Sequence, residues 1–203
     1  MVSFRRVLCY ILNCIFKRQG VYIVNDLITL TGYIIQDMTE PAGYLPFGIA
    51  AGAVFLLFRW ILKKKCAFPR GKTGLRQDVL LFLIALYAAV LLRLAFFSRE
   101  PGSRIDVSLA LFETWGATIR THSFFIENIL MFIPFGILIP AAFPAFRKLS
   151  RCTAAGFACS LFLELIQLAT GRGFFQLDDL VTNTVGTLLG ALIYLAVRRP
   201  SSS

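Results

Sequence analysis

Long apolar runs alternate with short clusters of lysine and arginine along most of this chain. Each run is about 20 residues long, which is the length that an α-helix needs to cross about 30 Å of hydrocarbon at about 1.5 Å per residue. The pattern therefore predicts an all-α fold, a polytopic transmembrane helical bundle with about five spans. We expect these spans at residues 42–62, 78–97, 124–143, 152–170 and 179–197.

The N-terminal segment follows a different pattern. Between residues 21 and 38, polar residues recur at helical spacing, at Asn25, Thr29, Gly32 and Gln36. This spacing is typical of an amphipathic helix, which would lie on the membrane or against the bundle. A sixth span over the same residues is the alternative.

The composition excludes an ordinary soluble domain, because 57% of the residues are hydrophobic and only 16% are charged. The chain has a formal net charge of +10, and its basic clusters at residues 63–76, 147–151 and 198–199 would all lie on one side of the membrane. By the positive-inside rule, these loops and the C-terminus are predicted to be cytoplasmic. The net charge therefore indicates orientation, and we expect no nucleic-acid partner.

Two further expectations concern the cysteines and the chain start. The five cysteines form no CxxC motif, and we expect neither a metal nor a cofactor. The apolar run at residues 7–16 is followed by basic residues where a signal peptide would have small ones. We therefore expect this segment in the mature protein. The chain then divides into an amphipathic segment (1–41), a first span with its basic loop (42–77), a four-helix membrane domain (78–198) and a tail (199–203).

Ionisable and amide side chains concentrate in and between the last two predicted spans. Such groups are costly in hydrocarbon unless they are paired or face water, so they are candidates for a functional site. Asn128 at the start of the third span and Arg99 after the second should approach the same end of the bundle. We expect all of them to line a polar cleft in the outer third of the bilayer. The other members are Glu164, Gln167, Arg172, Asp178, Asp179 and Asn183.

The same residues also permit a purely architectural interpretation. Asp178 or Asp179 would cap the last helix, and Arg172 would pair with an aspartate. Asn128 and Gln167 would form hydrogen bonds between helices.

Small residues and prolines add structural expectations. Pro134 and Gly136 interrupt the third span and predict a kink or a short break. Gly186 and Gly190 continue a row of small residues from Thr182 on one face of the last span, which permits close helix approach.

At these positions the chain resembles the VanZ-like family of bacterial membrane proteins. The resemblance covers roughly residues 80–197 and is strongest in ENILMFIPFGILIP and ELIQLATGRGFFQLDDLVTNTVGTLLGALI. Arg99 stands where the family usually carries an arginine after the second span, whereas residues 106–112 depart from the family pattern. The matching positions are Asn128, Pro134, Gly136, Glu164, Gln167, Arg172, Asp178, Asp179, Asn183, Gly186 and Gly190. Because the family is named for a teicoplanin-resistance protein, the resemblance implies a multi-pass protein of the bacterial cytoplasmic membrane that lowers susceptibility to this lipid-tailed glycopeptide.

Several functions stay open. The favoured one is a non-enzymatic envelope protein whose cleft binds an amphiphile, either the glycopeptide antibiotic or a lipid-linked cell-wall precursor. The first alternative is a membrane enzyme acting on such a lipid, with Glu164 as general acid or base and Asp178 and Asp179 holding a divalent cation. The sequence offers no nucleophile motif for it. A small transporter or a scaffold are the remaining alternatives.

Overall fold

The computed structural model describes residues 4–65, 74–97, 102, 107–112, 115 and 118–198, with side chains from residue 24 onward. Five of its helices are long and apolar enough to cross a membrane, at Leu45–Lys65, Leu75–Phe97, Ile119–Ala142, Leu149–Thr170 and Leu177–Val197. The predicted all-α transmembrane bundle is therefore confirmed. The elements are α1 (Phe4–Gly43), α2 (Leu45–Lys65), α3 (Leu75–Leu92), the π-helix η1 (Arg93–Phe97), β1 (Val107–Ser108), α4 (Ile119–Ala142), the 3-10 helix η2 (Pro144–Phe146), α5 (Leu149–Thr170), β2 (Phe175–Gln176) and α6 (Leu177–Val197).

Local sequence explains where the spans begin and end. The Thr118 side chain accepts a hydrogen bond from Thr121 N at 3.2 Å and caps the start of α4. At the end of α5, Gly171 adopts the left-handed conformation with a φ of 62°, which glycine reaches at little cost. The last turn of α2 carries the lysines at residues 63–65, where the helix dipole favours positive charge.

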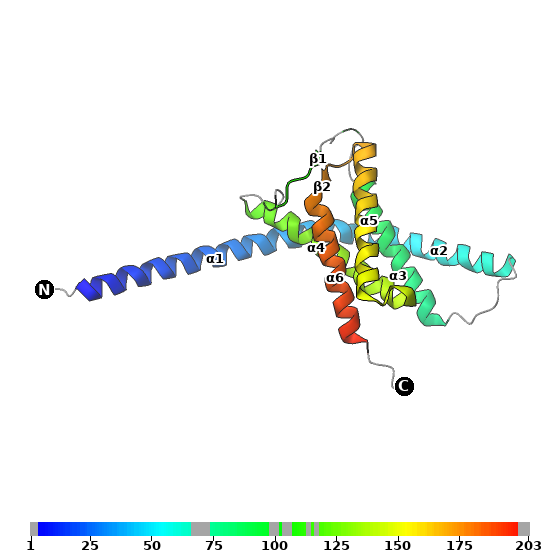
Figure 1. The fold of residues 1–203 in the computed structure, drawn as a ribbon, viewed down its shortest axis with the longest axis horizontal. Coiled ribbons are helices and arrows are strands. Elements are labelled where there is room, and N and C mark those ends of the chain that lie inside the picture. Colours follow the sequence, from blue (N-terminus) through cyan, green and yellow to red (C-terminus); the bar gives the residue numbers. More distant parts are fainter. Residues whose placement is uncertain are drawn as a thin grey trace.

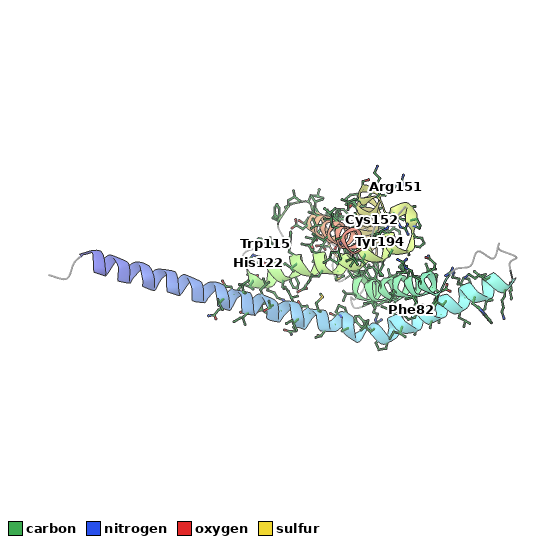
Figure 2. The ribbon with its side chains drawn as sticks, turned by 90° about the horizontal axis from the view of Figure 1, so that it is seen from below. Phe82, Trp115, His122, Arg151, Cys152 and Tyr194 are labelled. Atoms are coloured by element: carbon green, nitrogen blue, oxygen red, sulfur yellow. The ribbon has the colours of Figure 1, made fainter. Side chains whose placement is uncertain are left out.

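The N-terminal segment is one continuous helix of 40 residues, much longer than predicted. Figure 1 shows α1 projecting well beyond the bundle, and Figure 2 shows α1 and α2 running along one side of the other helices. Over its 40 residues, the sequence of α1 does not separate apolar from polar positions onto opposite faces. The predicted amphipathic character is therefore unsupported. Nor is α1 among the helices of the described part that could span a membrane.

Helices α2 and α3 form a hairpin held by close contacts to glycine. A Cβ atom added at Gly52 would lie 2.7 Å from the ring of Phe82, and one added at Gly48 would lie 2.9 Å from the Val90 side chain. Figure 2 shows Phe82 on the side of α3 that faces α2. Replacing either glycine would push the two helices apart.

The closest packing in the bundle joins α4 to α6. A Cβ atom at Gly136, Gly186 or Gly190 would lie only 2.1 to 2.2 Å from a backbone carbonyl oxygen of the facing helix. Helix α4 runs without interruption through Pro134 and Pro140, so of the kink or short break expected in the third span, the break is absent. We call this contact, at Gly136, Gly186 and Gly190, the α4–α6 seam.

Two connections meet at one end of the bundle and pair as strands. β1, before α4, and β2, before α6, form a parallel two-stranded sheet with Val107 opposite Phe175 and Ser108 opposite Gln176. Figure 1 shows this pair beside the start of α6. We call this the β end. It gathers the end of α3 with η1, the start of α4, the end of α5 and the start of α6.

Candidate functional site

A cavity of about 540 Å³ opens at the β end, among α1, α3 with η1, α4, α5, β2 and α6. Its walls combine apolar side chains, including Leu91, Met131 and Leu163, with an unusual concentration of polar ones. Five of the predicted site residues line it: Asn128, Glu164, Gln167, Asp179 and Asn183. The polar lining also includes Asp37, Glu40, Arg120, Glu127 and Gln176.

Hydrogen bonds between elements position the predicted residues. Asn128 on α4 donates through Nδ2 to Asp179 Oδ1 on α6 at 2.7 Å. On α5, the Glu164 carboxylate accepts from the backbone N–H of Gln176 at 3.1 Å, so it fixes the turn into α6. These bonds hold the polar groups at the start of α6 against both neighbouring helices.

Apart from Asp37 Oδ2, which forms an ion pair with Arg120, two buried acceptor atoms in this cavity have no hydrogen-bond partner among the described residues. They are Glu127 Oε1 and Asn183 Oδ1, on residues that are 8% and 7% exposed. The Asn183 amide does donate to Ser160 Oγ at 2.9 Å, and the Glu127 carboxyl group lies beside the carboxyl group of Asp37 and the hydroxyl group of Ser123, with which it can share hydrogen bonds. A buried polar atom without a partner costs roughly 1–3 kcal/mol. A ligand that donated hydrogen bonds to these two atoms would therefore remove this cost.

The π-helix η1 explains the placement of Gln167 and Arg172. A π turn changes the backbone hydrogen-bond pattern of a helix. Two of its carbonyls accept from side chains of the α5 region: Ala95 O from Gln167 Nε2 at 3.2 Å and Phe96 O from Arg172 Nη1 at 2.8 Å. The Arg172 guanidinium also lies 5.9 Å from the Phe97 ring centre. Arg172 does not line the cavity but a separate apolar groove on the other side of η1.

Asp178 lies outside the cavity as well. Its Oδ1 accepts from the backbone N–H of Phe112 at 2.6 Å, and the residue is only 3% exposed. It therefore fastens the connection before α4 to the first turn of α6. The predicted capping of α6 by Asp178 or Asp179 is wrong, because Gln176 is the N-cap residue and no side chain caps it. Arg99 lies outside the described residues.

The two aspartates at the start of α6 act separately. Asp178 accepts a hydrogen bond from Phe112 N and Asp179 accepts one from Asn128 Nδ2, so each carboxylate holds a different part of the fold. In the described part of the chain, no group of three or more His, Cys, Asp or Glu side chains is arranged to hold a metal ion.

Sequence reasoning missed the contribution of α1 to the cavity. Arg120 at the start of α4 forms an ion pair with Asp37, with Nη1 and Oδ2 2.7 Å apart. Its guanidinium also lies 4.9 Å from the ring centre of Tyr33 and 4.7 Å from that of Phe124. No sequence pattern links residues 83 positions apart. The only hint in the sequence was Asp37, which follows Tyr33 by about one helical turn.

Glu40 stands at the α1 side of the same cavity. It accepts a hydrogen bond at 2.9 Å from the hydroxyl group of Tyr44, the residue between α1 and α2. This hydrogen bond to a carboxylate raises the pKa of the Tyr44 phenol above its ordinary value. The interaction anchors the bend between the two helices beside the cavity.

Comparison with known proteins places the cavity-bearing part of the chain in a family. A model of the VanZ/LLP1 family matches residues 79–198, which is more than half of the chain and includes most of the cavity-lining residues. Protein VanZ from Enterococcus faecium is 38% identical over 69 residues, which are 34% of this chain and 42% of that protein. The match thus spans less than half of the relative. No solved structure matches the chain. On the strength of the family match, the chain belongs to the VanZ/LLP1 family of membrane proteins.

Proposed function

We propose that this chain is a protein of the bacterial cytoplasmic membrane whose β-end cavity binds the polar end of an amphiphile. In binding it, the chain lowers susceptibility to teicoplanin-type glycopeptides, which carry a lipid tail. The single observation that carries the proposal is the cavity itself. It encloses buried, unpartnered acceptors among apolar walls at the end of a set of membrane-spanning helices.

The chemistry of the lining supports an amphiphile over a fully polar ligand. Leu91, Met131, Leu163 and Phe174 line the same cavity as the carboxylates. Pockets of this volume suit small-molecule groups when a few polar atoms fix orientation against apolar walls. A ligand with one polar end and one acyl end could place each against matching side chains.

The distribution of basic residues supports a cavity open to the cell exterior. The lysines at residues 63–65 end α2, and Arg147, Lys148 and Arg151 lie around the start of α5. Arg198 follows the end of α6. All of these lie at the end of the bundle opposite the cavity. Under the positive-inside rule this end is cytoplasmic, and the β end then meets the outer surface, where glycopeptides and wall precursors occur.

The alternatives have less support from the described contacts. A lipid-active enzyme with Asp178 and Asp179 as cation ligands conflicts with the separate partners of the two carboxylates. A transporter built on discontinuous helices conflicts with the uninterrupted α4.

The test is antibiotic susceptibility in a sensitive Gram-positive host that expresses this chain. Teicoplanin and vancomycin are compared for the wild type, Glu127→Gln and the control Asp26→Asn at matched membrane abundance. Glu127 is chosen because it lines the cavity with an unpartnered oxygen. Asp26 is exposed on α1 and lies outside the cavity.

We expect the wild type and Asp26→Asn to protect against teicoplanin more than against vancomycin, and Glu127→Gln to lose that protection. If the wild type gives no protection, the resistance function is wrong. If Glu127→Gln protects as well as the wild type, the cavity is not the site of that function.

A further inference from the structure

We infer that the chain holds an anionic phospholipid where the span Leu75–Phe97 ends, with the lipid phosphate at Arg93 and an acyl chain in the apolar groove beside η1. This site is separate from the cavity of the proposed function, because different residues of α3 and η1 line the groove and the cavity. Three observations support the inference: the contacts of Arg93, its depth in the span and the composition of the groove.

The Arg93 side chain contacts aromatic rings and no carboxylate. Its guanidinium carbon lies 5.4 Å from the ring centre of Tyr44 and 5.9 Å from that of Phe97. In the described part of the chain, this side chain forms neither a hydrogen bond nor an ion pair. A ring face attracts a cation, but it does not replace the acceptor oxygens that the N–H donors of a guanidinium ordinarily bind. Arg93 therefore has donors left for an anionic ligand.

The depth of Arg93 matches the level of the lipid headgroups. The span ends at Phe97, and Arg93 begins η1, about one helical turn before that end. A charge this close to hydrocarbon is costly unless it is paired or reaches the interface, and an arginine at such a position extends its charged end toward the headgroups. Arg93 is only half-buried. A phosphate group of the bilayer can therefore approach its guanidinium group.

The apolar groove beside η1 supplies a place for the lipid tail. Its volume is about 600 Å³. Phe97 lines this groove, is 60% exposed and has its ring against Arg93. An acyl chain in the groove would therefore have its polar end beside a positive charge. The described lining consists of Leu92, Phe96, Phe97, Ile166, Thr170 and Arg172.

The chemistry of Arg93 favours a phosphate with a net negative headgroup. A guanidinium binds phosphate through two parallel hydrogen bonds, and basic pockets between membrane helices bind anionic headgroups. A zwitterionic headgroup adds an ammonium group, which Arg93 repels. One carboxylate stands close by, because Glu40 accepts from the hydroxyl group of Tyr44, whose ring lies against Arg93. The negative charge of Glu40 should weaken binding of the lipid, and this gives the test a variant with the opposite sign.

Native mass spectrometry of the purified full chain in a neutral detergent tests the inference, because it counts bound lipids directly. The probes are dioleoylphosphatidylglycerol and dioleoylphosphatidylcholine, which share their tails, and glycerol 3-phosphate, which has a phosphate head without a tail. Affinities are compared for the wild type, Arg93→Gln, Glu40→Gln and the control Arg198→Gln. Arg198 is exposed after the end of α6, so its substitution removes the same charge at the opposite end of the bundle.

We expect the wild type to bind phosphatidylglycerol about fivefold more tightly than phosphatidylcholine, the factor that corresponds to one basic residue at a membrane surface. Arg93→Gln should remove this preference, and Glu40→Gln should increase it. Arg198→Gln should leave it nearly unchanged. Gel filtration confirms that each variant is folded. Because Arg93→Gln and Glu40→Gln are expected to act in opposite directions, a general loss of structure cannot produce both results.

Three results would overturn the inference. The first is equal affinity of the wild type for the two lipids, and the second is an equal effect of Arg93→Gln and Arg198→Gln. The third is binding of glycerol 3-phosphate as tight as that of phosphatidylglycerol, which would mean that Arg93 binds free phosphate and that the groove holds no tail. Ile166→Trp, which fills the groove, should weaken both lipids alike. None of these results bears on the susceptibility test, because Glu127 lines the cavity and not the groove.

Discussion

The two ends of the α4–α6 contact differ in how closely the helices pack and in how fully their polar atoms are hydrogen-bonded. At the seam, Gly136, Gly186 and Gly190 bring the helices to backbone contact, with no room for a single added methyl group. Less than one turn from Gly186 toward the β end, the same helices line a cavity of about 540 Å³, where Glu127 and Asn183 have buried oxygens without a hydrogen-bond partner among the described residues. One helix pair therefore contains both the closest backbone packing in the described bundle and buried acceptor oxygens that lack a hydrogen-bond partner.

This contrast distinguishes architecture from function. In a membrane, helices associate through close packing and interhelical hydrogen bonds, because lipid provides no hydrophobic driving force between them. The seam supplies that association. The cavity weakens it, since unfilled volume and unpartnered acceptors both cost stability. The seam can hold the bundle together while the cavity is left open for a ligand.

The largest effect is expected when the seam is changed. Gly186→Ala places a Cβ atom 2.1 Å from Ile129 O, and the helices must separate to admit it. We expect a loss of about 3 kcal/mol, at the upper end of the usual cost of overpacking. The measurement is the melting temperature of the purified protein in detergent, followed by the fraction that remains monodisperse after heating.

Gly32→Ala is the matched control for this prediction. Nothing lies within 4 Å of a Cβ atom added at Gly32, and alanine is favoured over glycine in a helix by about 1 kcal/mol. The same substitution should therefore stabilise slightly on α1 and destabilise strongly at the seam. Equal melting temperatures for the two variants would contradict the observed seam geometry.

An intermediate effect is expected at the edge of the cavity. Gln167→Leu removes the side chain that donates to Ala95 O in the π turn. Because Ala95 is only 8% exposed, its carbonyl group would be buried without this partner. We expect a loss of about 2 kcal/mol in stability, with faster hydrogen exchange in residues 93–97. Gln36→Leu changes an exposed glutamine on α1 and should have little effect. If the two variants behave alike, Gln167 does not support η1.

The spans could be predicted from the sequence because each depends on local information. A run of about 20 apolar residues needs no partner in order to be identified as a span. The residues that the structure brings to the cavity on α5 and α6 were also accessible, since Glu164 and Gln167 lie three apart on one helix, and Asp179 and Asn183 lie four apart on another. Helical spacing and shared depth in the membrane are sufficient for that placement.

The remaining features depend on contacts between distant segments. The ion pair of Asp37 with Arg120 joins two helices whose docking no local pattern specifies. The same holds for the β1–β2 pair and for the bond from Phe112 N to Asp178. The π turn at residues 93–97 is another case, because its apolar sequence is indistinguishable from that of an ordinary span. For the same reason Arg172 was assigned to the cleft, although its guanidinium supports η1.

The smallest effect on stability is expected for two single cysteine substitutions on one face of α6. They compare directly how open the cavity and the closely packed part of the helix are to a reagent. In a background without the native cysteines, Asn183→Cys places a thiol in the cavity wall, and Thr187→Cys places one a turn further on, level with the seam and packed against Gly156 of α5. Each change should cost about 1 kcal/mol or less. A small neutral methanethiosulfonate should react readily at position 183 and very slowly at position 187, where the side chain is completely buried.

The reaction rates are compared in the folded protein and after unfolding in denaturant, where both thiols should react equally. Thr187 packs so closely that an added Cβ atom at Gly156 would lie 2.2 Å from its Oγ1, so reagent can reach position 187 only if the helices part. Equal rates in the folded state would mean that the packing of α6 around Thr187 opens enough to admit the reagent as readily as the cavity does. The division of α6 into a closed architectural half and an open binding half would then be wrong.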